Sequence, residues 1–399
     1  IVDESTLKIE FAEGFNGTYS YSKANGNLIL DVSGSAEGST NQIATITTKI
    51  PYNTLEGRKF TYRVLEGNIE FTDSSILTTT FSTANMSVPI EAAYVTTVDG
   101  TIVGGGNSKI YVKDASQAPV EGVGVYNASD NSLIGTTDEN GEVETDIFSS
   151  SVQKISIYAM KDGNYSFKCS TQSVKAACNE NGEPQYVLIN ASQNGSNAKN
   201  ISWLSNPLAS KDESYVRFAL KDDYEQRGDE AFTEVKGTNK LYSFLGSSNI
   251  EQNYIARINT VKLEGLKGNS EYVYSVGDGQ KWSNVKPFST ALANGDTNFF
   301  VFGDIQAEDT TKISNLMSAV ANDGVDYDLG IQTGDSIETA NIYSHWDDIL
   351  KVFSNDNISD IDLLHVLGNH EFMGDPQADS SVLIYNLQNK DFYSLDYGN

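Results

Sequence analysis

Up to about residue 290, short apolar or alternating runs are separated by turn residues, chiefly Gly, Asn, Asp and Ser. Runs of this kind predict β-strands, and their regular spacing favours sandwiches over helical folds. The clearest runs are residues 28–32, 43–50, 60–64, 102–103, 110–112, 123–126, 155–159 and 187–189. No helical periodicity occurs before about residue 309, so this region is expected to be all-β.

Turn-rich segments divide the β region at intervals of about 100 residues, the usual size of a sandwich domain. They are Gly104–Gly106, the segment 190–200, which is rich in Asn, Ser and Gly, and the segment 291–296. We therefore expect β-sandwich modules at 1–104, 105–198 and 199–291, and a further domain at 292–399. The length of 399 residues fits this multidomain organisation.

The pattern changes at Asn298. Phe299–Phe302 is a continuous apolar run that predicts a strand buried on both faces. The runs 327–331 and 363–367 predict two more strands, and the segments between them have the apolar spacing of one helix face. The apolar positions in the two helical segments are Ile313, Leu316, Met317 and Val320, then Ile342, Trp346, Ile349, Leu350 and Phe353. The expected fold is βαβαβ with a parallel sheet, an α/β domain after three all-β modules.

Polar side chains follow each of the three predicted strands. Asp304, Asp335 and Asn369 come directly after a Gly, 31 and 34 residues apart, which is about one βαβ unit. Because parallel strands share a carboxyl edge, these side chains are expected to converge there. Converging carboxylates repel one another unless protons or cations lie between them. Since Asp and Asn supply hard oxygen ligands, the sequence predicts a pair of metal ions bridged by one Asp.

The net charge of −27 argues against nucleic acid and anionic membrane surfaces as partners. Residues 297–399 alone carry 18 acidic and 3 basic side chains. No run of about 18 apolar residues occurs, so membrane insertion is not expected. The two cysteines, Cys169 and Cys178, could form a disulfide or be free thiols.

The first two predicted modules resemble domains of cell-surface proteins. The phrases Pro119–Tyr126 and Ile134–Val143, the latter with a turn at Asp138–Gly141, are similar to carboxypeptidase-regulatory-like or Cna-B-like sandwiches of bacterial surface proteins. The first module bears a weak cohesin-like resemblance through Val95–Val103. These resemblances imply a secreted or cell-surface location, with cell-wall or surface attachment as one option.

The third module contains the phrase Tyr272–Gly279, in which Tyr272, Tyr274 and Val276 alternate and predict one buried aromatic strand face. With Trp282-Ser283, this phrase resembles the fibronectin-III-like N-terminal domain of purple acid phosphatases. A generic fibronectin-like spacer is the alternative interpretation.

Gly303-Asp304, Gly334-Asp335 and Gly368-Asn369-His370-Glu371 together resemble the calcineurin-like metallophosphoesterases, and the preceding module favours their purple acid phosphatase branch. The resemblance implies two divalent or trivalent metal ions, of Fe, Mn, Zn or Mg, and a phosphorylated small-molecule substrate. It also implies that Asp304 is a metal ligand, Asp335 the bridging ligand and Asn369 a ligand of the second ion. His370 would contact the phosphate or protonate the leaving group.

The chain departs from the family pattern at two positions. Gln306 stands where the general family has His, and Glu338 stands where purple acid phosphatases have Tyr. Both carry oxygen donors, and Glu338 is the better candidate ligand. Their oxygen donors slightly favour harder ions over Zn.

The remaining family ligands are histidines from motifs that would follow Asn399, and His345 and His365 are expected to be structural. We therefore expect half a metal site in this chain, with weak metal binding and little activity. The function predicted is hydrolysis of phosphate mono- or diesters by a metal-bridging water. The alternatives are a non-catalytic cell-surface or adhesion protein with a degenerate phosphoesterase domain, and an acidic, calcium-binding cell-wall appendage.

Overall fold

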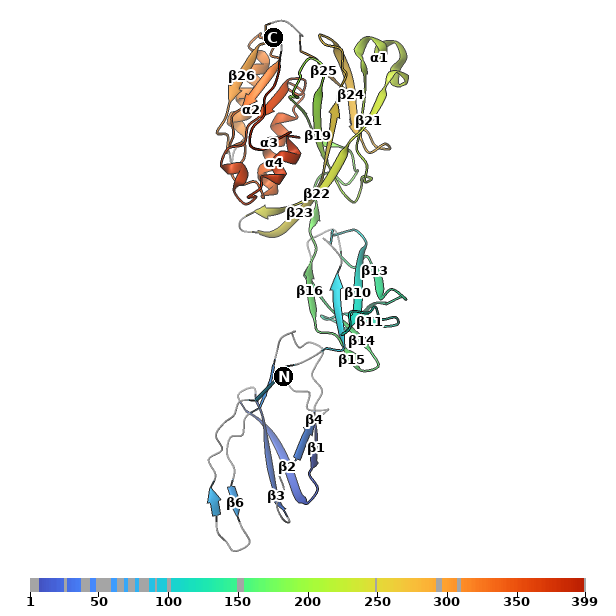
Figure 1. Cartoon of the computed structure of the whole chain (residues 1–399), viewed down its shortest axis with the longest axis vertical. Helices are drawn as coiled ribbons and strands as arrows, with labels where there is room; N and C mark the ends of the chain where they lie inside the picture. Colours follow the sequence, from blue (N-terminus) through green and yellow to red (C-terminus); the bar gives the residue numbers. More distant parts are fainter. Residues whose placement is uncertain are drawn as a thin grey trace. The chain divides into compact units, whose positions relative to one another are not determined.

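The computed structural model of the chain is mostly β (Figure 1). It describes residues 7–24, 27–36, 44–47, 59–62, 68–70, 76–78, 86–89, 92–98, 102–148, 154–247, 250–291, 296–306 and 310–397. The chain divides into two compact units. The first unit comprises residues 1–100, 107–147 and 154–172, and the second comprises residues 101–106, 148–153 and 173–399.

The first unit contains a two-sheet sandwich around a small aliphatic core. One antiparallel sheet has the order β13 (Glu142–Thr145), β10 (Ser108–Asp114), β9 (Tyr94–Val98). The other contains β12 (Leu133–Thr136), β11 (Gly124–Asn127), β14 (Lys154–Lys161), β15 (Asn164–Tyr165) and β16 (Cys169–Gln172). Its buried core comprises Ile110, Val112, Val123, Val125, Val143, Ile157 and Ala159. Because β9 pairs with β10, the predicted division at residue 104 falls within the connection between two strands of one sheet.

The rest of the first unit is described as separate two-stranded ladders. They are β1 (Lys8–Phe11) with β4 (Ala44–Thr47), β2 (Phe15–Ala24) with β3 (Asn27–Ala36), β5 (Lys59–Tyr62) with β8 (Met86–Pro89), and β6 (Asn68–Glu70) with β7 (Ile76–Thr78). Much of the predicted cohesin-like module lies outside the described residues. Its existence as a sandwich therefore stays a prediction.

The second unit is built on one large mixed sheet and one small antiparallel sheet. The large sheet has the order β17 (Lys175–Ala176), β23 (Ile250–Leu263), β19 (Lys199–Ser205), β18 (Gln185–Asn190), β28 (Asp362–His365), β27 (Leu329–Gln332), β26 (Phe299–Phe302). A further strand, β22 (Thr238–Ser247), pairs with β23. The small sheet has the order β21 (Thr233–Lys236), β20 (Tyr215–Leu220), β24 (Glu271–Gly277), β25 (Lys286–Ser289). The helices are α1 (Lys221–Arg227), α2 (Thr311–Asn322), α3 (Tyr343–Phe353) and α4 (Asp379–Ile384), with 3₁₀ turns η2 (Gly228–Ala231) and η3 (His370–Phe372).

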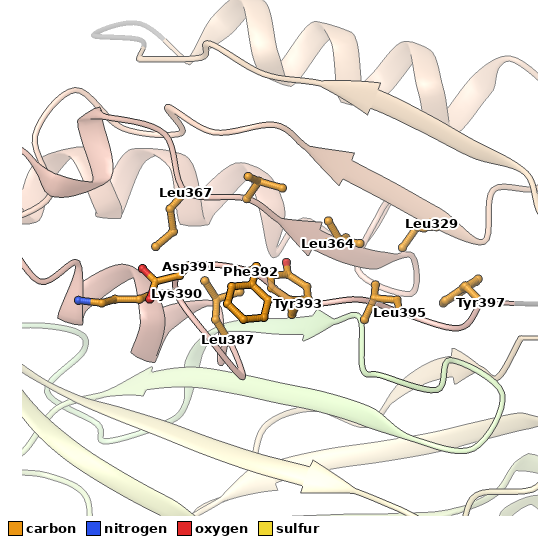
Figure 2. Close-up of a pocket in the computed structure, with 11 residues that line it drawn as sticks. Leu329, Leu364, Leu367, Leu387, Lys390, Asp391, Phe392, Tyr393, Leu395 and Tyr397 are labelled. Atoms are coloured by element: carbon orange, nitrogen blue, oxygen red, sulfur yellow. The ribbon is translucent and has the colours of Figure 1, made fainter.

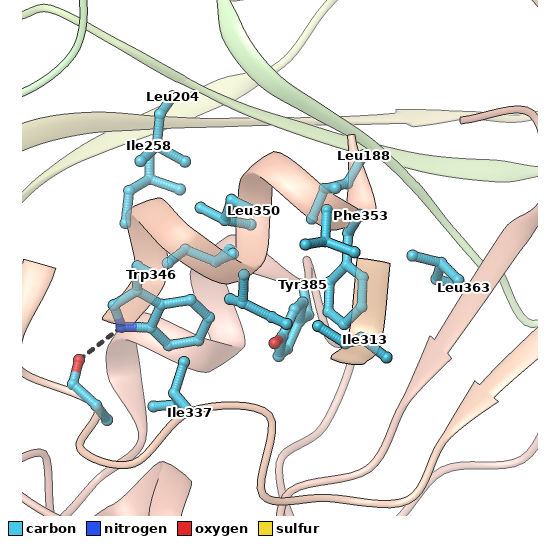
Figure 3. Close-up of a cluster of buried hydrophobic side chains, with 14 of the residues drawn as sticks. Leu188, Leu204, Ile258, Ile313, Ile337, Trp346, Leu350, Phe353, Leu363 and Tyr385 are labelled. Carbon is cyan, nitrogen blue, oxygen red and sulfur yellow. Dashed lines mark hydrogen bonds between the residues drawn. The ribbon is translucent and has the colours of Figure 1, made fainter. Parts of the chain in front are cut away.

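Two hydrophobic cores cover the two faces of the large sheet. On one face, side chains such as Ile201 and Trp203 pack against the small sheet, whose Tyr272, Tyr274 and Val276 are buried as predicted. On the other face, Leu188, Leu204 and Ile258 pack against the helical layer (Figure 3). Every residue of β19 is buried, as expected for a central strand covered on both faces.

The third predicted module and the α/β segment share this sheet. β18 pairs in parallel with β28 at Asn190 and Leu363. β18 also pairs antiparallel with β19, so the turn-rich segment 190–200 is a connection within one module and not a boundary between two. Residues of both segments therefore contribute to one core, which the sequence pattern did not predict.

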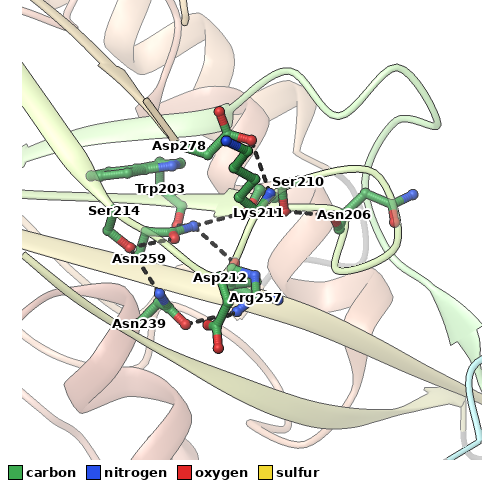
Figure 4. Close-up of polar contacts among 11 residues, drawn as sticks. Trp203, Asn206, Ser210, Lys211, Asp212, Ser214, Asn239, Arg257, Asn259 and Asp278 are labelled. Atoms are coloured by element: carbon green, nitrogen blue, oxygen red, sulfur yellow. Dashed lines mark hydrogen bonds and ion pairs between the residues drawn. The ribbon is translucent and has the colours of Figure 1, made fainter. Parts of the chain in front are cut away.

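A buried polar network fixes the loop after β19 to the sheet (Figure 4). The Asn259 side-chain amide donates to the Trp203 carbonyl at 3.3 Å, and its oxygen accepts a hydrogen bond from the Ser214 hydroxyl at 2.8 Å. Arg257 donates to Asn239 at 2.8 Å and pairs with Asp212. Because buried polar groups need partners, this network specifies one position for the loop 206–214.

The helical segments agree with the predicted pattern in α3 and differ elsewhere. All five apolar positions predicted for the second helical segment are buried. In α2, Leu316 is 47% exposed, so the predicted apolar face is narrower than its spacing suggested. α1 was not predicted, because it has no buried residue and hence no apolar periodicity.

β26 is not buried on both faces, contrary to the prediction. Phe299 and Val301 are 55% and 57% exposed, whereas Phe302 is buried. The reason is that β26 is the edge strand of the sheet and only one of its faces meets the helical layer. A continuous apolar run cannot reveal which of its residues lie on an open face.

His365 is a buried histidine in β28, as predicted for a structural residue. Its ring stacks on Tyr385 with centroids 3.6 Å apart, and neither ring nitrogen has a hydrogen-bond partner among the described residues. Burial lowers the pKa of His365 to about 3. The folded protein therefore holds this ring neutral under conditions in which the unfolded chain takes up a proton.

We expect this difference to make stability depend on pH. Between pH 6.5 and pH 3 the unfolded state binds the extra proton, so unfolding becomes easier as the pH falls. His365 should account for a loss of about 2 kcal/mol between pH 7 and pH 5. Urea unfolding of the wild type and His365→Phe at both values, followed by tryptophan fluorescence, measures this contribution. A difference between the two proteins that is equal at both pH values would contradict it.

Two sequence expectations concern cysteines and membranes. Both cysteines are free thiols in the structure, and burial raises the pKa of the Cys178 thiol to about 12. Among the described residues, no helix combines the length and apolar character needed to cross a bilayer.

Candidate metal-binding rim

The candidate site lies where β26, β27 and β28 end. The three strands pair in parallel, with Phe302 beside Gln332 and Gln332 beside His365. The loops that follow them begin at Gly303, Thr333 and Val366. The common strand direction therefore brings the loops carrying Asp304, Asp335 and Asn369 to one edge of the sheet.

The carboxylates of Asp304 and Asp335 meet at the side-chain amide of Gln306. The Gln306 Nε2 atom donates to Asp335 Oδ2 at 3.0 Å and, more weakly, to Asp304 Oδ1 at 3.4 Å. Asp304 is exposed, and Asp335 and Gln306 are half-buried. Two acidic oxygens thus lie within reach of one nitrogen atom, at the place where the sequence predicted a shared cation.

The backbone holds these loops in an uncommon conformation. Asp304, Gln306 and Asp335 have φ values of 51°, 34° and 56°, in or near the left-handed region that few non-glycine residues adopt. The N–H groups of Ile305 and Gln306 both donate to the Asp335 carbonyl, at 3.0 and 3.2 Å. Residues held in this region cost about 1–3 kcal/mol each and concentrate at functional sites.

A buried carboxylate joins the second loop to the third. Glu371 is completely buried and accepts hydrogen bonds from the backbone N–H groups of Asp335, Ser336 and Gly368, at 2.9, 2.8 and 2.7 Å. The loops are so close that a Cβ atom on Gly368 would lie 2.2 Å from Asp335 Oδ1. Glu371 is therefore the group that fixes the distance between the loops after β27 and β28.

Sequence reasoning assigned no role to Glu371, although it is the last residue of the Gly-Asn-His-Glu phrase. The sequence nevertheless indicates such a role, because tight loops after buried strands leave backbone N–H groups without a partner in a neighbouring strand. The Glu371 carboxylate, two residues after the candidate ligand Asn369, is a suitable acceptor for these N–H groups.

His370 lies directly beside this carboxylate pair. Its backbone N–H donates to Asp335 Oδ1 at 2.9 Å, and its Nδ1 lies 2.8 Å from the Glu338 carbonyl oxygen. Since a carbonyl only accepts, Nδ1 carries the proton and Nε2 is left for another partner. The hydrogen bond to Glu338, assisted by the nearby carboxylates, raises the pKa of His370.

The remaining predicted residues are less closely gathered. The Glu338 carboxylate lies 3.7 Å from His370 Nδ1 and is 45% exposed, with no contact to Asp304 or Asp335 among the described residues. Asn369 is exposed at the start of η3, and its side chain has no hydrogen bond to the described residues. His345 accepts a hydrogen bond from the Thr339 N–H at 3.0 Å within the α3 region, which is consistent with a structural role.

Within the described part of the chain, no three His, Cys, Asp or Glu side chains lie close enough together to hold a metal ion. The rim gathers two carboxylates and an amide, with the Asn369 amide on the adjoining loop. This donor set consists entirely of oxygen ligands apart from His370, and it fits a hard cation.

A cavity of about 380 Å³ lies beside β27 and β28, against the C-terminal segment (Figure 2). Its lining residues include Leu364, Leu367, Phe392 and Tyr393. None of the predicted site residues lines it. The cavity is therefore separate from the rim that carries Asp304 and Asp335.

The fold indicates a protein in which a fibronectin-III-like module is joined to a parallel α/β segment. Comparison with known proteins agrees with this description. Residues 184–290 match the family model for the purple acid phosphatase N-terminal domain. The match confirms the resemblance predicted for this module and relates it to a phosphatase family. It begins at residue 184, at β18 and ahead of the predicted division between 198 and 199.

No curated protein matches the chain significantly. Among solved structures, purple acid phosphatase PPD1 from yellow lupin (Lupinus luteus) seeds is similar at 15% identity with a TM-score of 0.42, over 77% of this chain and 65% of that chain. PhoD is similar at 14% identity with a TM-score of 0.33, over 49% of this chain and 41% of that one. The chicken CNTN1 FN1–FN3 domains are similar at 14% identity with a TM-score of 0.26, over 71% of this chain and 89% of that one. The chain thus spans less than two thirds of the lupin and PhoD chains.

Proposed function

We propose that this chain contributes the oxygen-ligand part of a two-metal site that hydrolyses phosphate mono- or diesters. The observation that carries the proposal is the meeting of the Asp304 and Asp335 carboxylates at Gln306, on the carboxyl edge of parallel strands. His370 adjoins them through its backbone hydrogen bond to Asp335. The purple acid phosphatase match immediately before this segment agrees with the same chemistry.

In this proposal Asp304 holds one ion, Asp335 bridges both, and Asn369 holds the second. Bound ions of this kind supply an acidified water and neutralise charge on the phosphoryl group. The ions would be Fe, Mn, Zn or Mg, and the donor set favours the harder ones. Glu338 as a further ligand stays a prediction, because its carboxylate lies beside His370 and away from the carboxylate pair.

His370 supplies the proton-bearing group of the site. With Nδ1 held by the Glu338 carbonyl, Nε2 is free to face a phosphoryl or leaving-group oxygen. The hydrogen bond to the Glu338 carbonyl raises the pKa of His370 and so favours the charged ring, in which both nitrogens are donors. Such a donor stabilises negative charge that develops on oxygen during phosphoryl transfer.

We also propose the arrangement in which this site is used. The β-sandwich sheets of the first unit and the module similar to the purple acid phosphatase N-terminal domain precede the strands β26, β27 and β28 that carry the site. The surface-protein resemblances favour a secreted or cell-surface protein that acts on phosphorylated small molecules. A net charge of −27 disfavours nucleic acid as the substrate.

Metal binding tests the proposal directly. The 399-residue protein is titrated with Mn²⁺, and free Mn²⁺ is measured by electron paramagnetic resonance. We expect weak binding that falls at least tenfold in Asp335→Asn, because the bridging carboxylate is lost, and remains in His370→Ala, because His370 is not a ligand. Any Mn²⁺-dependent hydrolysis of p-nitrophenyl phosphate should be slow and should decline in both variants.

Two results would contradict the proposal. The first is Mn²⁺ affinity unchanged in Asp335→Asn. The second is rapid hydrolysis that survives this substitution. A protein that binds no metal would instead favour the alternative of a non-catalytic surface protein, which the departures at Gln306 and Glu338 already support.

A further inference from the structure

The second unit buries a lysine and an aspartate in direct contact. Lys199 Nζ in β19 lies 2.6 Å from Asp362 Oδ2 in β28, and the two side chains are 1% and 0% exposed. The Phe288 ring lies over the ammonium group, with its centroid 5.9 Å from Nζ. In the sheet, β18 lies between β19 and β28, so the pair joins two strands that are not neighbours. Neither group takes part in the proposed metal site.

The hydrogen bonding of this pair is incomplete. Asp362 Oδ2 also accepts a hydrogen bond from the Tyr397 hydroxyl at 2.7 Å, whereas Asp362 Oδ1 is buried and has no partner among the described residues. A buried ion pair is favourable only when its remaining hydrogen-bonding groups are satisfied, since both ions have lost their water. Transfer of one proton from Nζ to Oδ2 gives a neutral amine beside a carboxylic acid, and burial penalises this form less than the two ions.

We propose that Lys199 and Asp362 condense slowly to an amide that cross-links β19 to β28. Nζ attacks Asp362 Cγ, so that an N–C bond forms and the Cγ–Oδ2 bond breaks. Oδ2 leaves as water with two of the three ammonium protons, and Oδ1 becomes the carbonyl oxygen of the amide. The reaction consumes no co-reactant, and it removes both buried charges. This inference does not depend on the proposed metal site.

The contacts of the pair supply what the reaction needs. The Tyr397 hydroxyl donates to the oxygen that leaves, so it stabilises negative charge on Oδ2 during the reaction. Well-oriented groups within one molecule react with effective concentrations of roughly 10⁵–10⁸ M. Because only the neutral amine is a nucleophile, the reaction is nevertheless slow. Freshly folded protein therefore holds the ion pair, and the amide accumulates with time.

The amide would join two segments of the second unit covalently. Lys199 and Asp362 are 163 positions apart in the sequence. The link ties the module that matches the purple acid phosphatase N-terminal domain to one of the strands that carry the candidate rim. Like a disulfide, a covalent link across a long loop restricts the unfolded chain and so favours the folded state. Cross-linked protein should therefore unfold at a higher urea concentration than fresh protein.

Intact-mass spectrometry of the full chain, fresh and after several weeks at neutral pH, tests the proposal. The wild type should accumulate a species that is lighter by one water molecule, reaching about a tenth of the chains. After trypsin digestion, tandem mass spectrometry should find a branched peptide that contains both Lys199 and Asp362. The exposed pair of Lys221 and Glu271, 2.7 Å apart, is the control within the same sample and should give no branched peptide.

Two variants separate the reaction from other losses of water. Lys199→Arg keeps the positive charge but offers no nucleophilic amine, so it should give no branched peptide. Tyr397→Phe lacks the donor to Oδ2 and should accumulate the cross-link at least threefold more slowly. An unchanged rate in Tyr397→Phe would refute the part assigned to Tyr397.

Two results for the wild type would overturn the proposal without any variant having to fold. The first is aged protein with no lighter species. The second is a lighter species without the branched peptide, which would locate the loss of water elsewhere, such as in a cyclic imide at an exposed aspartate.

Discussion

Lys199→Met is expected to lower the free energy of unfolding of the second unit by about 3–5 kcal/mol. Lys199 in β19 forms an ion pair with Asp362 in β28, with Nζ and Oδ2 2.6 Å apart. The side chains are 1% and 0% exposed, so neither charge is solvated. Removing the lysine leaves a buried carboxylate whose one remaining hydrogen-bond donor among the described residues is the Tyr397 hydroxyl, at 2.7 Å. An uncompensated buried charge is among the most destabilising of single changes.

Urea unfolding measured by tryptophan fluorescence reports on this unit alone, because Trp203, Trp282 and Trp346 all lie in it. Lys221→Met is the matched control. Its ammonium pairs with Glu271 at 2.7 Å, but the two side chains are 43% and 65% exposed. Loss of an exposed pair should cost no more than about 1 kcal/mol.

A second substitution separates a buried charge from a general packing defect. In Lys199→Met combined with Asp362→Leu, both charges are replaced by apolar groups, and most of the lost stability should return. A double variant as unstable as Lys199→Met would show that the lysine stem and its packing matter more than the ion pair. Equal effects of Lys199→Met and Lys221→Met would refute the prediction outright.

Glu371→Ala should both destabilise the second unit, by about 3–5 kcal/mol, and abolish measurable Mn²⁺ binding. Three backbone N–H groups, of Asp335, Ser336 and Gly368, lose their acceptor. Each unsatisfied buried donor costs about 1–3 kcal/mol. Metal binding should fail in addition, because the loops after β27 and β28 are no longer held at a fixed separation and Asp335 and Asn369 cannot act together.

Glu371→Gln provides the conservative comparison. Its one carbonyl oxygen can still accept from two of the three donors, since Oε2 of Glu371 accepts from both Asp335 and Gly368. Stability and Mn²⁺ affinity should lie between those of the wild type and Glu371→Ala. The positioning role would be refuted by a Glu371→Ala protein that unfolds at a lower urea concentration but binds Mn²⁺ as the wild type does.

The sequence located the elements of the α/β segment from local information. Glycine followed by a polar residue marks the point at which a buried strand turns into a loop, and this happens at Asp304, Asp335 and Asn369. The apolar spacing of the second helical segment likewise predicted five side chains that are all buried, and of the buried side chains in α3 it missed Val352. Both patterns, the glycine followed by a polar residue and the helical apolar spacing, depend on residues within one turn or one strand. They can therefore be recognised without knowledge of the fold.

The boundaries between modules were harder to predict from the sequence than the elements of the α/β segment. Turn-rich composition at 104–106 and 190–200 suggested boundaries, yet each of these segments connects two strands of the same sheet. The composition of a loop reports that the chain turns, and does not report which strands pair across the turn. The pairing of β18 with β28, at Asn190 and Leu363, joins segments that are far apart in the sequence.

The sequence by itself determined which residues end the three parallel strands, and the shared direction of those strands is enough to bring their loops to one edge. Only the tertiary structure decided that Gln306 lies between the two carboxylates, that Glu371 joins two loops from beneath, and that Glu338 turns toward His370. It also decided that β18 extends the parallel sheet and that Phe299 and Val301 lie on an open face. These features depend on which surfaces meet across the fold, and residue order along the chain does not encode distances between elements that are far apart in sequence.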